Sequence, residues 1–259
     1  MFALLLLSLL TISSVLGVPP LEGPYLPGGR IVGGEDADIA DYPYQLCLIF
    51  EDFGPFCGAI LIDEEWALTA AHCTLDAEAN NLTVRAGSSL STSGGQLVNV
   101  EKIYQHKGFN YDTAENDISL LKLASKVTVA NSKVIALATS KPKANETATI
   151  TGWGITDELD ESMGPEVLQV VQVPVADQED CKKAFIVEGV TDTMFCAGFF
   201  NVGGKDACTG DSGGPLVVEG VVAGITSWSK GCARPDRLGV YTNVASFLDW
   251  IEETKNSDQ

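Results

Sequence analysis

The chain has 259 residues, 45% of them hydrophobic, and its 35 acidic residues against 16 basic residues give a formal net charge of −19 at pH 7. That charge excludes binding to nucleic acids through their phosphates and favours a soluble protein that attracts basic partners. A chain of this length buries enough apolar surface to form a sizeable core.

The first segment, residues 1–17, is predicted to be a signal peptide. Residues 2–16 are almost entirely apolar, and such a run is too short to favour a transmembrane span. Small residues at the end of the segment place the cleavage site near Gly17. No other apolar run is long enough to cross a bilayer, so we expect a secreted, extracellular protein without a membrane partner.

The second segment, residues 18–30, is predicted to be a propeptide that ends at Arg30. Its four prolines and several glycines keep the backbone extended. The mature chain would then be residues 31–259. It keeps the net charge of −19, because Glu22 and Arg30 cancel in the removed part.

The mature chain is dominated by short β-rich segments separated by turn clusters. Examples are residues 46–50, 59–62, 66–69, 97–100, 118–123, 147–151, 168–173, 215–218 and 221–227. Many short strands with turn signals indicate barrels or sandwiches, between which the periodicity does not choose. Near the end, Val244, Phe247, Leu248 and Ile251 follow a helical spacing, and Asn243 is placed to cap the start of that helix.

Ser212, within Gly210-Asp211-Ser212-Gly213-Gly214, is the candidate nucleophile. A serine hydroxyl reacts only with help from a positioned base. The glycines allow a sharp turn and close approach of a substrate carbonyl, so the N–H groups of Gly210 and Ser212 are candidates for an oxyanion hole. The alternative, a glycine-rich surface turn between two strands, is disfavoured because the chain also contains a base and an orienting acid.

The candidate base is one of only two histidines, unless it is a lysine. His72 follows an apolar run and lies next to a cysteine that could pin it. His106 lies in a polar, turn-like stretch and is interpreted as structural or exposed. Asp117 begins an apolar, strand-like run and is the candidate orienting acid, although an acid in such a place is often a solvated turn residue. The order His, Asp, Ser is that of the chymotrypsin arrangement.

Four motifs occur along nearly the whole mature chain, from about residue 30 to about residue 250. They are Ile31-Val32-Gly33-Gly34, Thr69-Ala70-Ala71-His72-Cys73, Asp117-Ile118-Ser119-Leu120-Leu121 and Gly210-Asp211-Ser212-Gly213-Gly214-Pro215. Together they resemble the trypsin-like serine proteases of the chymotrypsin family, which are made as secreted zymogens.

The resemblance implies an all-β, chymotrypsin-like fold: two antiparallel six-stranded β-barrels with a C-terminal α-helix. The catalytic residues His72, Asp117 and Ser212 would lie in the cleft between the barrels. We place the boundary near residues 129–133. The serine protease domain, 31–259, would then divide into an N-terminal barrel at about 31–131 and a C-terminal barrel with the helix at about 132–259.

The resemblance also implies activation by cleavage between Arg30 and Ile31. The new amino group of Ile31 would insert and pair with Asp211, beside the nucleophile. A buried carboxylate without a partner is costly, and the ammonium group would be that partner. Because the cleavage site follows an arginine, the activating enzyme should itself be trypsin-like, another copy of this protein included.

Seven cysteines in a secreted chain indicate disulfides with one cysteine left over, and the sequence alone does not select the pairing. Cys47 lies in an apolar, strand-like run and is interpreted as a buried, inert thiol, with an intermolecular disulfide as the alternative. Scattered cysteines disfavour a zinc site. The pairs that the resemblance implies are Cys57 with Cys73, Cys181 with Cys196, and Cys208 with Cys232.

The resemblance assigns Asp206, six residues before Ser212, to the floor of the specificity pocket. A buried carboxylate selects Arg or Lys side chains, because burying another charge state beside it is costly. Ala207 has no hydroxyl to offer a lysine, so we expect a preference for Arg over Lys. Gly239 matches a glycine that keeps the pocket open.

Ser227, Trp228 and Ser229 match the strand that pairs with the substrate backbone. Ser229 departs from the pattern, since trypsins usually have glycine at this point of the pocket entrance. Its extra atoms would narrow the mouth and weaken the binding of long basic side chains.

The loop in which relatives often bind Ca²⁺ corresponds to residues 87–100. It contains no Asp or Glu, and Ca²⁺ usually takes carboxylate ligands. We therefore expect no calcium there, no other metal and no cofactor.

Two surface features remain. Residues 156–166 form an acidic segment without Lys or Arg, so self-cleavage in it should be slow. Asn81-Leu82-Thr83 and Asn145-Glu146-Thr147 are candidate N-glycosylation sites.

These residues predict a monomeric serine endopeptidase, most simply digestive, that cleaves after Arg and Lys through an acyl-enzyme. Its partners would be basic protein and peptide substrates, an activating trypsin-like protease and protein inhibitors. Two alternatives are an inactive, protease-like binding protein and, if Ser229 spoils the basic pocket, a broad or chymotrypsin-like protease.

Overall fold

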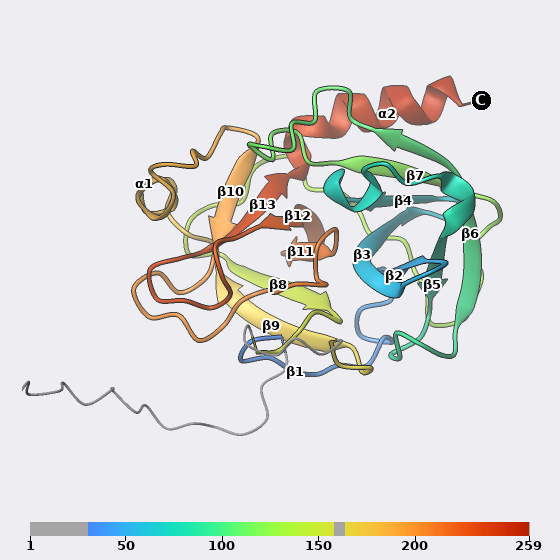
Figure 1. Cartoon of the computed structure of the whole chain (residues 1–259), viewed down its shortest axis with the longest axis horizontal. Coiled ribbons are helices and arrows are strands. Elements are labelled where there is room, and N and C mark those ends of the chain that lie inside the picture. The colour runs from blue at the N-terminus through green and yellow to red at the C-terminus, as the bar shows by residue number, and fades with distance from the viewer. Residues whose placement is uncertain (1–30, 158–163, 259) are drawn as a thin grey trace, which may run out of the picture.

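A computed structural model of the chain describes residues 31–157 and 164–258. The predicted signal peptide and propeptide, including Arg30, therefore lie outside the described residues, as does the middle of the acidic segment 156–166. In the described parts, two β-structures lie side by side, and a C-terminal helix crosses one end of them (Figure 1).

The first β-structure is a closed antiparallel barrel. Its alternating apolar residues face inward, as in β5, where Leu82, Val84 and Ala86 are buried and Thr83 and Arg85 are not. Around the barrel the strands follow the order β2 (Gln45–Phe50), β3 (Gly54–Asp63), β4 (Trp66–Thr69), β7 (Ser119–Leu123), β6 (Gln96–Gln105) and β5 (Leu82–Ala86).

The second β-structure is a seven-stranded antiparallel sheet. Its order is β1 (Glu35–Asp36), β9 (Gln169–Pro174), β8 (Thr147–Gly152), β11 (Pro215–Val218), β12 (Val221–Trp228), β13 (Gly239–Asn243) and β10 (Met194–Ala197). An isolated bridge between Val175 and Ala197 brings its two sides together. Backbone hydrogen bonds from Ala176 N–H to Cys196 O and from Gly198 N–H to Pro174 O, each 2.9 Å, flank that bridge.

The predicted all-β, chymotrypsin-like fold is thereby confirmed, with one difference of detail. The second β-structure has seven strands where six were expected, because β1 adds a short edge strand, and an isolated bridge brings its two sides together. The segment that links the barrels follows the first one as far as Ile135, whose N–H bonds Leu61 O, and joins the second at Ala138, whose N–H bonds Val222 O. The barrel boundary near 129–133 stays a prediction.

The predicted C-terminal helix is present, but it begins as a 3₁₀ turn, η3 (Val244–Phe247), and continues as α2 (Leu248–Ser257). Val244, Phe247 and Ile251 are buried, as their spacing indicates. The predicted cap by Asn243 is wrong. Asn243 ends β13, and its side chain bonds Ser246 Oγ (2.8 Å) and caps no backbone group.

The remaining helical pieces are short. They are η1 (His72–Thr74), η2 (Ala79–Asn81) and α1 (Gln178–Ala184), and Asp177 caps α1 by accepting a hydrogen bond from Glu179 N–H. Within residues 31–157 and 164–258, no helix has the length and apolar character needed to span a membrane.

Candidate active site

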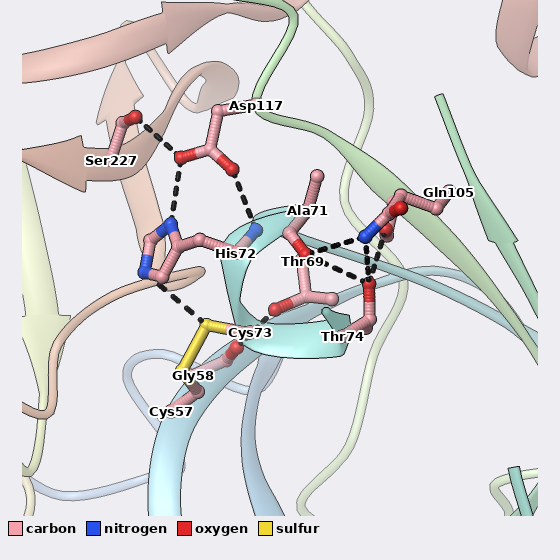
Figure 2. The surroundings of a disulfide bond; sticks show 11 residues. Cys57, Gly58, Thr69, Ala71, His72, Cys73, Thr74, Gln105, Asp117 and Ser227 are labelled. Carbon is pink, nitrogen blue, oxygen red and sulfur yellow. Dashed lines mark hydrogen bonds and ion pairs between the residues drawn. A yellow bond between two sulfur atoms is a disulfide. The ribbon is translucent and has the colours of Figure 1, made fainter. Parts of the chain in front are cut away.

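His72 and Asp117 meet because their strands are neighbours. β4 leads into η1 and β7 follows Asp117, and the two strands pair with Thr69 opposite Ser119. Asp117 Oδ2 lies 2.8 Å from His72 Nδ1, and Asp117 Oδ1 accepts the His72 main-chain N–H at 2.9 Å. This two-point contact, drawn in Figure 2, fixes the imidazole with Nδ1 toward the acid and Nε2 free to accept a proton.

Groups from both barrels position this pair. The Ser227 hydroxyl, on β12, donates to Asp117 Oδ2 at 2.5 Å, and the Thr242 hydroxyl, on β13, donates to Asp117 O at 2.8 Å. Asp117 is 1% exposed, whereas the His72 side chain is 26% exposed. Asp117 is thus enclosed, whereas the His72 side chain faces solvent.

On the other side of His72, Ala71 O anchors the start of η1. It accepts hydrogen bonds from Gln105 Nε2 (2.9 Å) and Thr74 Oγ1 (3.0 Å), as Figure 2 shows. His72 Nε2 lies 3.7 Å from Cys73 Sγ. No hydrogen bond joins His72 to Ser212 in the described chain, and in free enzymes such bonds are often long until substrate binds.

Ser212 lies in a loop that crosses to the first barrel. Ser212 O accepts a hydrogen bond from Gly58 N–H at 2.7 Å. Gly213 has φ +77°, and a Cβ there would lie 2.2 Å from Thr69 Oγ1. Only glycine allows this approach, so Gly213 holds Ser212 against the strand that leads to His72.

The main-chain N–H groups around Ser212 alternate in their bonding. Asp211 N–H bonds Cys208 O, and Gly213 N–H bonds Thr226 O. The N–H groups of Gly210 and Ser212 donate to no acceptor among the described residues. Two unused donors beside a serine hydroxyl are the arrangement that stabilises an oxyanion.

Asp211 is completely buried. Its carboxylate accepts hydrogen bonds from Gly154 N–H (2.8 Å) and Cys208 N–H (2.9 Å), and burial raises its pKa to about 6. No cationic side chain contacts it in the described part of the chain. A Cβ at Gly152 would lie 2.1 Å from Oδ1, so only glycine leaves room for this acid.

Ile31 is also completely buried, in the core of the second barrel. Two residues later, Gly33 packs so closely that a Cβ would lie 2.2 Å from Gly204 O. Between them, Val32 O accepts a hydrogen bond from Asp206 N–H at 3.1 Å. The segment from Ile31 to Gly33 therefore contacts the segment that carries Asp206.

A cavity of about 260 Å³ opens beside Ser212. Asp206 lies in its wall and is 3% exposed. Its Oδ2 accepts Ala233 N–H at 3.1 Å, but its buried Oδ1 has no partner. Burial raises the pKa of Asp206 to about 7. Gly239 leaves the cavity open next to Asp206, because a Cβ at position 239 would lie 2.8 Å from Asp206 Oδ1.

The other residues expected in the pocket also line this cavity. They are Ala207, Ser227, Trp228 and Ser229. Tyr241 lines it too, and its buried hydroxyl has no partner. Sequence reasoning did not assign a role to Tyr241, although its position two residues after Gly239 puts it on the same face of β13.

The structure contains the three implied disulfides, Cys57–Cys73, Cys181–Cys196 and Cys208–Cys232. Cys47 is a buried free thiol, and burial raises its pKa to about 12. The sulfurs of Cys57 and Cys73 lie near the His72 ring, but both belong to a disulfide and offer no thiolate to a metal.

The family model described as Trypsin matches residues 31–251. A trypsin of Phaedon cochleariae is 41% identical over 88% of this chain and 89% of its own length. Trypsin 5G1 of Aedes aegypti is 42% identical over 87% of this chain and 85% of its own length, and Trypsin Blo t 3 of Blomia tropicalis is 42% identical over 86% and 85%.

Proposed function

Since the chain belongs to the trypsin family and is a trypsin-like serine endopeptidase, we propose that it cleaves peptide bonds after Arg and, less readily, Lys. One observation supports this proposed specificity: the buried Oδ1 of Asp206 has no partner and lies at the cavity beside Ser212. A guanidinium group would give that oxygen a charged hydrogen bond. Ala207 adds no hydroxyl for an ammonium group, which favours Arg.

In the proposed mechanism, His72 Nε2 takes the proton of Ser212 Oγ as that oxygen attacks the scissile carbonyl. Asp117 holds the ring and stabilises its charged form. The unused N–H groups of Gly210 and Ser212 receive the negative charge on the carbonyl oxygen. His72 then gives its proton to the leaving amine. Water, deprotonated by His72, hydrolyses the acyl-enzyme and regenerates Ser212.

We also propose that the enzyme is secreted as a zymogen and activated by cleavage between Arg30 and Ile31. The buried Asp211 carboxylate, which no described cation contacts, supports an ammonium partner arriving from Ile31. The pKa of an unperturbed α-amino group is roughly 8. Activity is therefore expected to decline at alkaline pH, and a plateau well past pH 11 would contradict the pairing.

The proposed partners follow from the family and the surface. Trypsin-family enzymes act on proteins and meet protein inhibitors, and the strongly acidic chain favours basic substrates. The activating protease would be trypsin-like, and the role digestive. Of the two sequons, Asn145 is exposed in a turn with φ +68°, which favours glycosylation there, whereas Asn81 is half-buried in η2.

The test uses the protein after cleavage at Arg30. Matched peptides with Arg, Lys, Phe or Leu before the scissile bond are compared in the wild type, in Ser212→Ala and in Asp206→Ser. The proposal expects Arg to be cleaved best, no turnover in Ser212→Ala and loss of the Arg preference in Asp206→Ser. Preference for Phe or Leu in the wild type would overturn the specificity, and no turnover at all would favour a non-catalytic binding protein.

A further inference from the structure

Ser229, Gly231 and Cys232 line the cavity beside Ser212, and we take residues 229–232 as its mouth. This short stretch of main chain lacks main-chain support. β12 ends at Trp228, whose ladder partner is Val240. In the described chain, residues 229–232 then form no hydrogen bond between main-chain groups, and Gly231 has φ +83°. Main-chain support returns at Ala233, whose carbonyl accepts Gly204 N–H. The walls at this point must therefore be held by side chains.

Ser229 is the side chain that crosses the gap. Its Oγ lies 2.7 Å from Gly231 O and 3.1 Å from Leu238 O. Leu238 directly precedes β13, so the hydroxyl joins the strand end of β12 to the start of β13 beyond their last ladder pair. The Ser229 side chain thus supplies a hydrogen bond between the two segments where the main-chain ladder of β12 and β13 has ended.

Side-chain contacts also hold Lys230 and Cys232, which follow Ser229. Lys230 forms an ion pair with Glu188, in the loop after α1, and Cys232 is joined to Cys208 by a disulfide. Neither contact reaches Leu238. Among the described contacts, the Ser229 hydroxyl is therefore the direct bond between the two segments that enclose the mouth.

We infer that Ser229 is a positioning residue that latches the mouth of the specificity cavity, and that its hydroxyl does not obstruct the cavity. This inference rests on the proposed function, because it concerns how that function's basic side chain is held. It replaces the expectation that Ser229 narrows the entrance: the hydroxyl is directed to two main-chain carbonyls and is not left to project into the opening.

The latch and the narrowing of the entrance predict opposite rankings of KM among the same Ser229 variants. Ser229→Ala keeps Cβ and loses the hydroxyl, Ser229→Gly loses both, and Ser229→Thr keeps a hydroxyl. If the hydroxyl is a latch, Ala and Gly both raise KM for an Arg peptide by about three- to tenfold, the effect of one lost hydrogen bond, and leave kcat nearly unchanged. Thr restores a KM close to that of the wild type.

The control is Ser132→Ala, because the Ser132 hydroxyl also donates to a main-chain carbonyl, Val129 O at 2.7 Å, in the segment that links the barrels. It should change no kinetic constant. The affinity for benzamidinium, a small cation that needs no turnover, is measured for every variant, and the Ala and Gly variants should bind it more weakly.

A lower KM in Ser229→Gly than in the wild type, with Ser229→Ala unchanged, would overturn the latch and restore the narrowing. Equal KM and equal benzamidinium affinity in all variants would overturn it as well. Failure of the processed wild type to cleave Arg peptides is a different result. It would contradict the proposed specificity, while benzamidinium binding would still decide the role of Ser229.

Discussion

Asp206 and Asp211 are both buried carboxylic acids with raised pKa values, but their surroundings differ. Each oxygen of Asp211 accepts a main-chain N–H, and two glycines press against it. Asp206 has one oxygen without a partner, and that oxygen lies at a cavity. A group left unsatisfied at a cavity is suited to bind a ligand, whereas a group enclosed by main chain is suited to an internal ion pair.

The pKa of Asp206 leads to the first prediction. Because burial raises it to about 7, half of the free protein has a neutral Asp206 at that pH, and only the ionised form attracts a cation. The dissociation constant for benzamidinium should therefore increase about fivefold between pH 7 and pH 6 and about tenfold per unit below that. Calorimetric titration between pH 5 and pH 9 measures it.

The control for this titration is Asp206→Asn, which should bind benzamidinium weakly and with no such dependence, since its amide does not titrate. A wild-type affinity that stays constant down to pH 5 would show that Asp206 is already fully ionised there.

At the scale of elements, apolar runs predicted several buried strands, such as β4 and β12, but not all of them. They did not point to β13, because Gly239 and Tyr241 dilute its apolar pattern, or to α1, which has only seven residues. Asn243 does stand directly before η3, but the expected cap is absent, because its side-chain amide donates to Ser246 Oγ and its Oδ1 has no partner among the described residues.

The loop after β5 is held by an internal cation. The Arg85 guanidinium donates to three carbonyl oxygens, those of Ser91 (3.0 Å), Thr92 (3.0 Å) and Gly94 (2.5 Å). Carbonyl oxygens that converge on one positive group are also what a calcium loop provides. In this chain the positive group is covalently attached, which agrees with the lack of acidic residues in that loop.

The second prediction follows from this loop. Arg85→Ala should lower the free energy of unfolding by about 1–3 kcal/mol, because it leaves carbonyls without their charged donor. Ca²⁺ or a chelator should leave the wild-type melting temperature unchanged. Urea unfolding of the Ser212→Ala protein, which cannot digest itself, measures both effects.

Lys126→Ala is the matched control for Arg85→Ala, since it removes an exposed ion pair with Glu64 and should cost less than about 1 kcal/mol. A clear rise of the wild-type melting temperature with Ca²⁺ would reject the internal-cation interpretation.

At the scale of the whole molecule, the candidate site depends on contacts between the barrels. Ser227 and Thr242 of the second barrel hold Asp117 of the first, and Gly58 of the first holds the Ser212 loop of the second. Motifs in the sequence indicated the candidate reacting residues. They could not indicate the residues that hold them, because Thr242 and Gly58 carry no motif and gain their roles only from the packing of one barrel on the other.

Asp211, which Gly152, Gly154 and Cys208 of the second barrel enclose, leads to the last prediction. Its pKa of about 6 exceeds the roughly 4 of an unfolded chain. The folded, uncleaved protein therefore binds more protons than the unfolded one in that window and loses stability as pH rises through it. A free Ile31 ammonium would remove this cost above pH 6. At pH 7 the cleaved form should be more stable by about 2–3 kcal/mol, which is about 5–10 °C in melting temperature.

At pH 4.5 the two forms should melt at nearly the same temperature, because a protonated Asp211 has no charge to pair. Calorimetric scans of cleaved and uncleaved Ser212→Ala protein at both pH values make the comparison. Asp211→Asn should abolish the difference at pH 7 and leave the value at pH 4.5 unaltered. A difference of equal size at both pH values would instead assign the stabilisation to removal of residues 18–30, because the charge of Asp211 would then make no contribution to it.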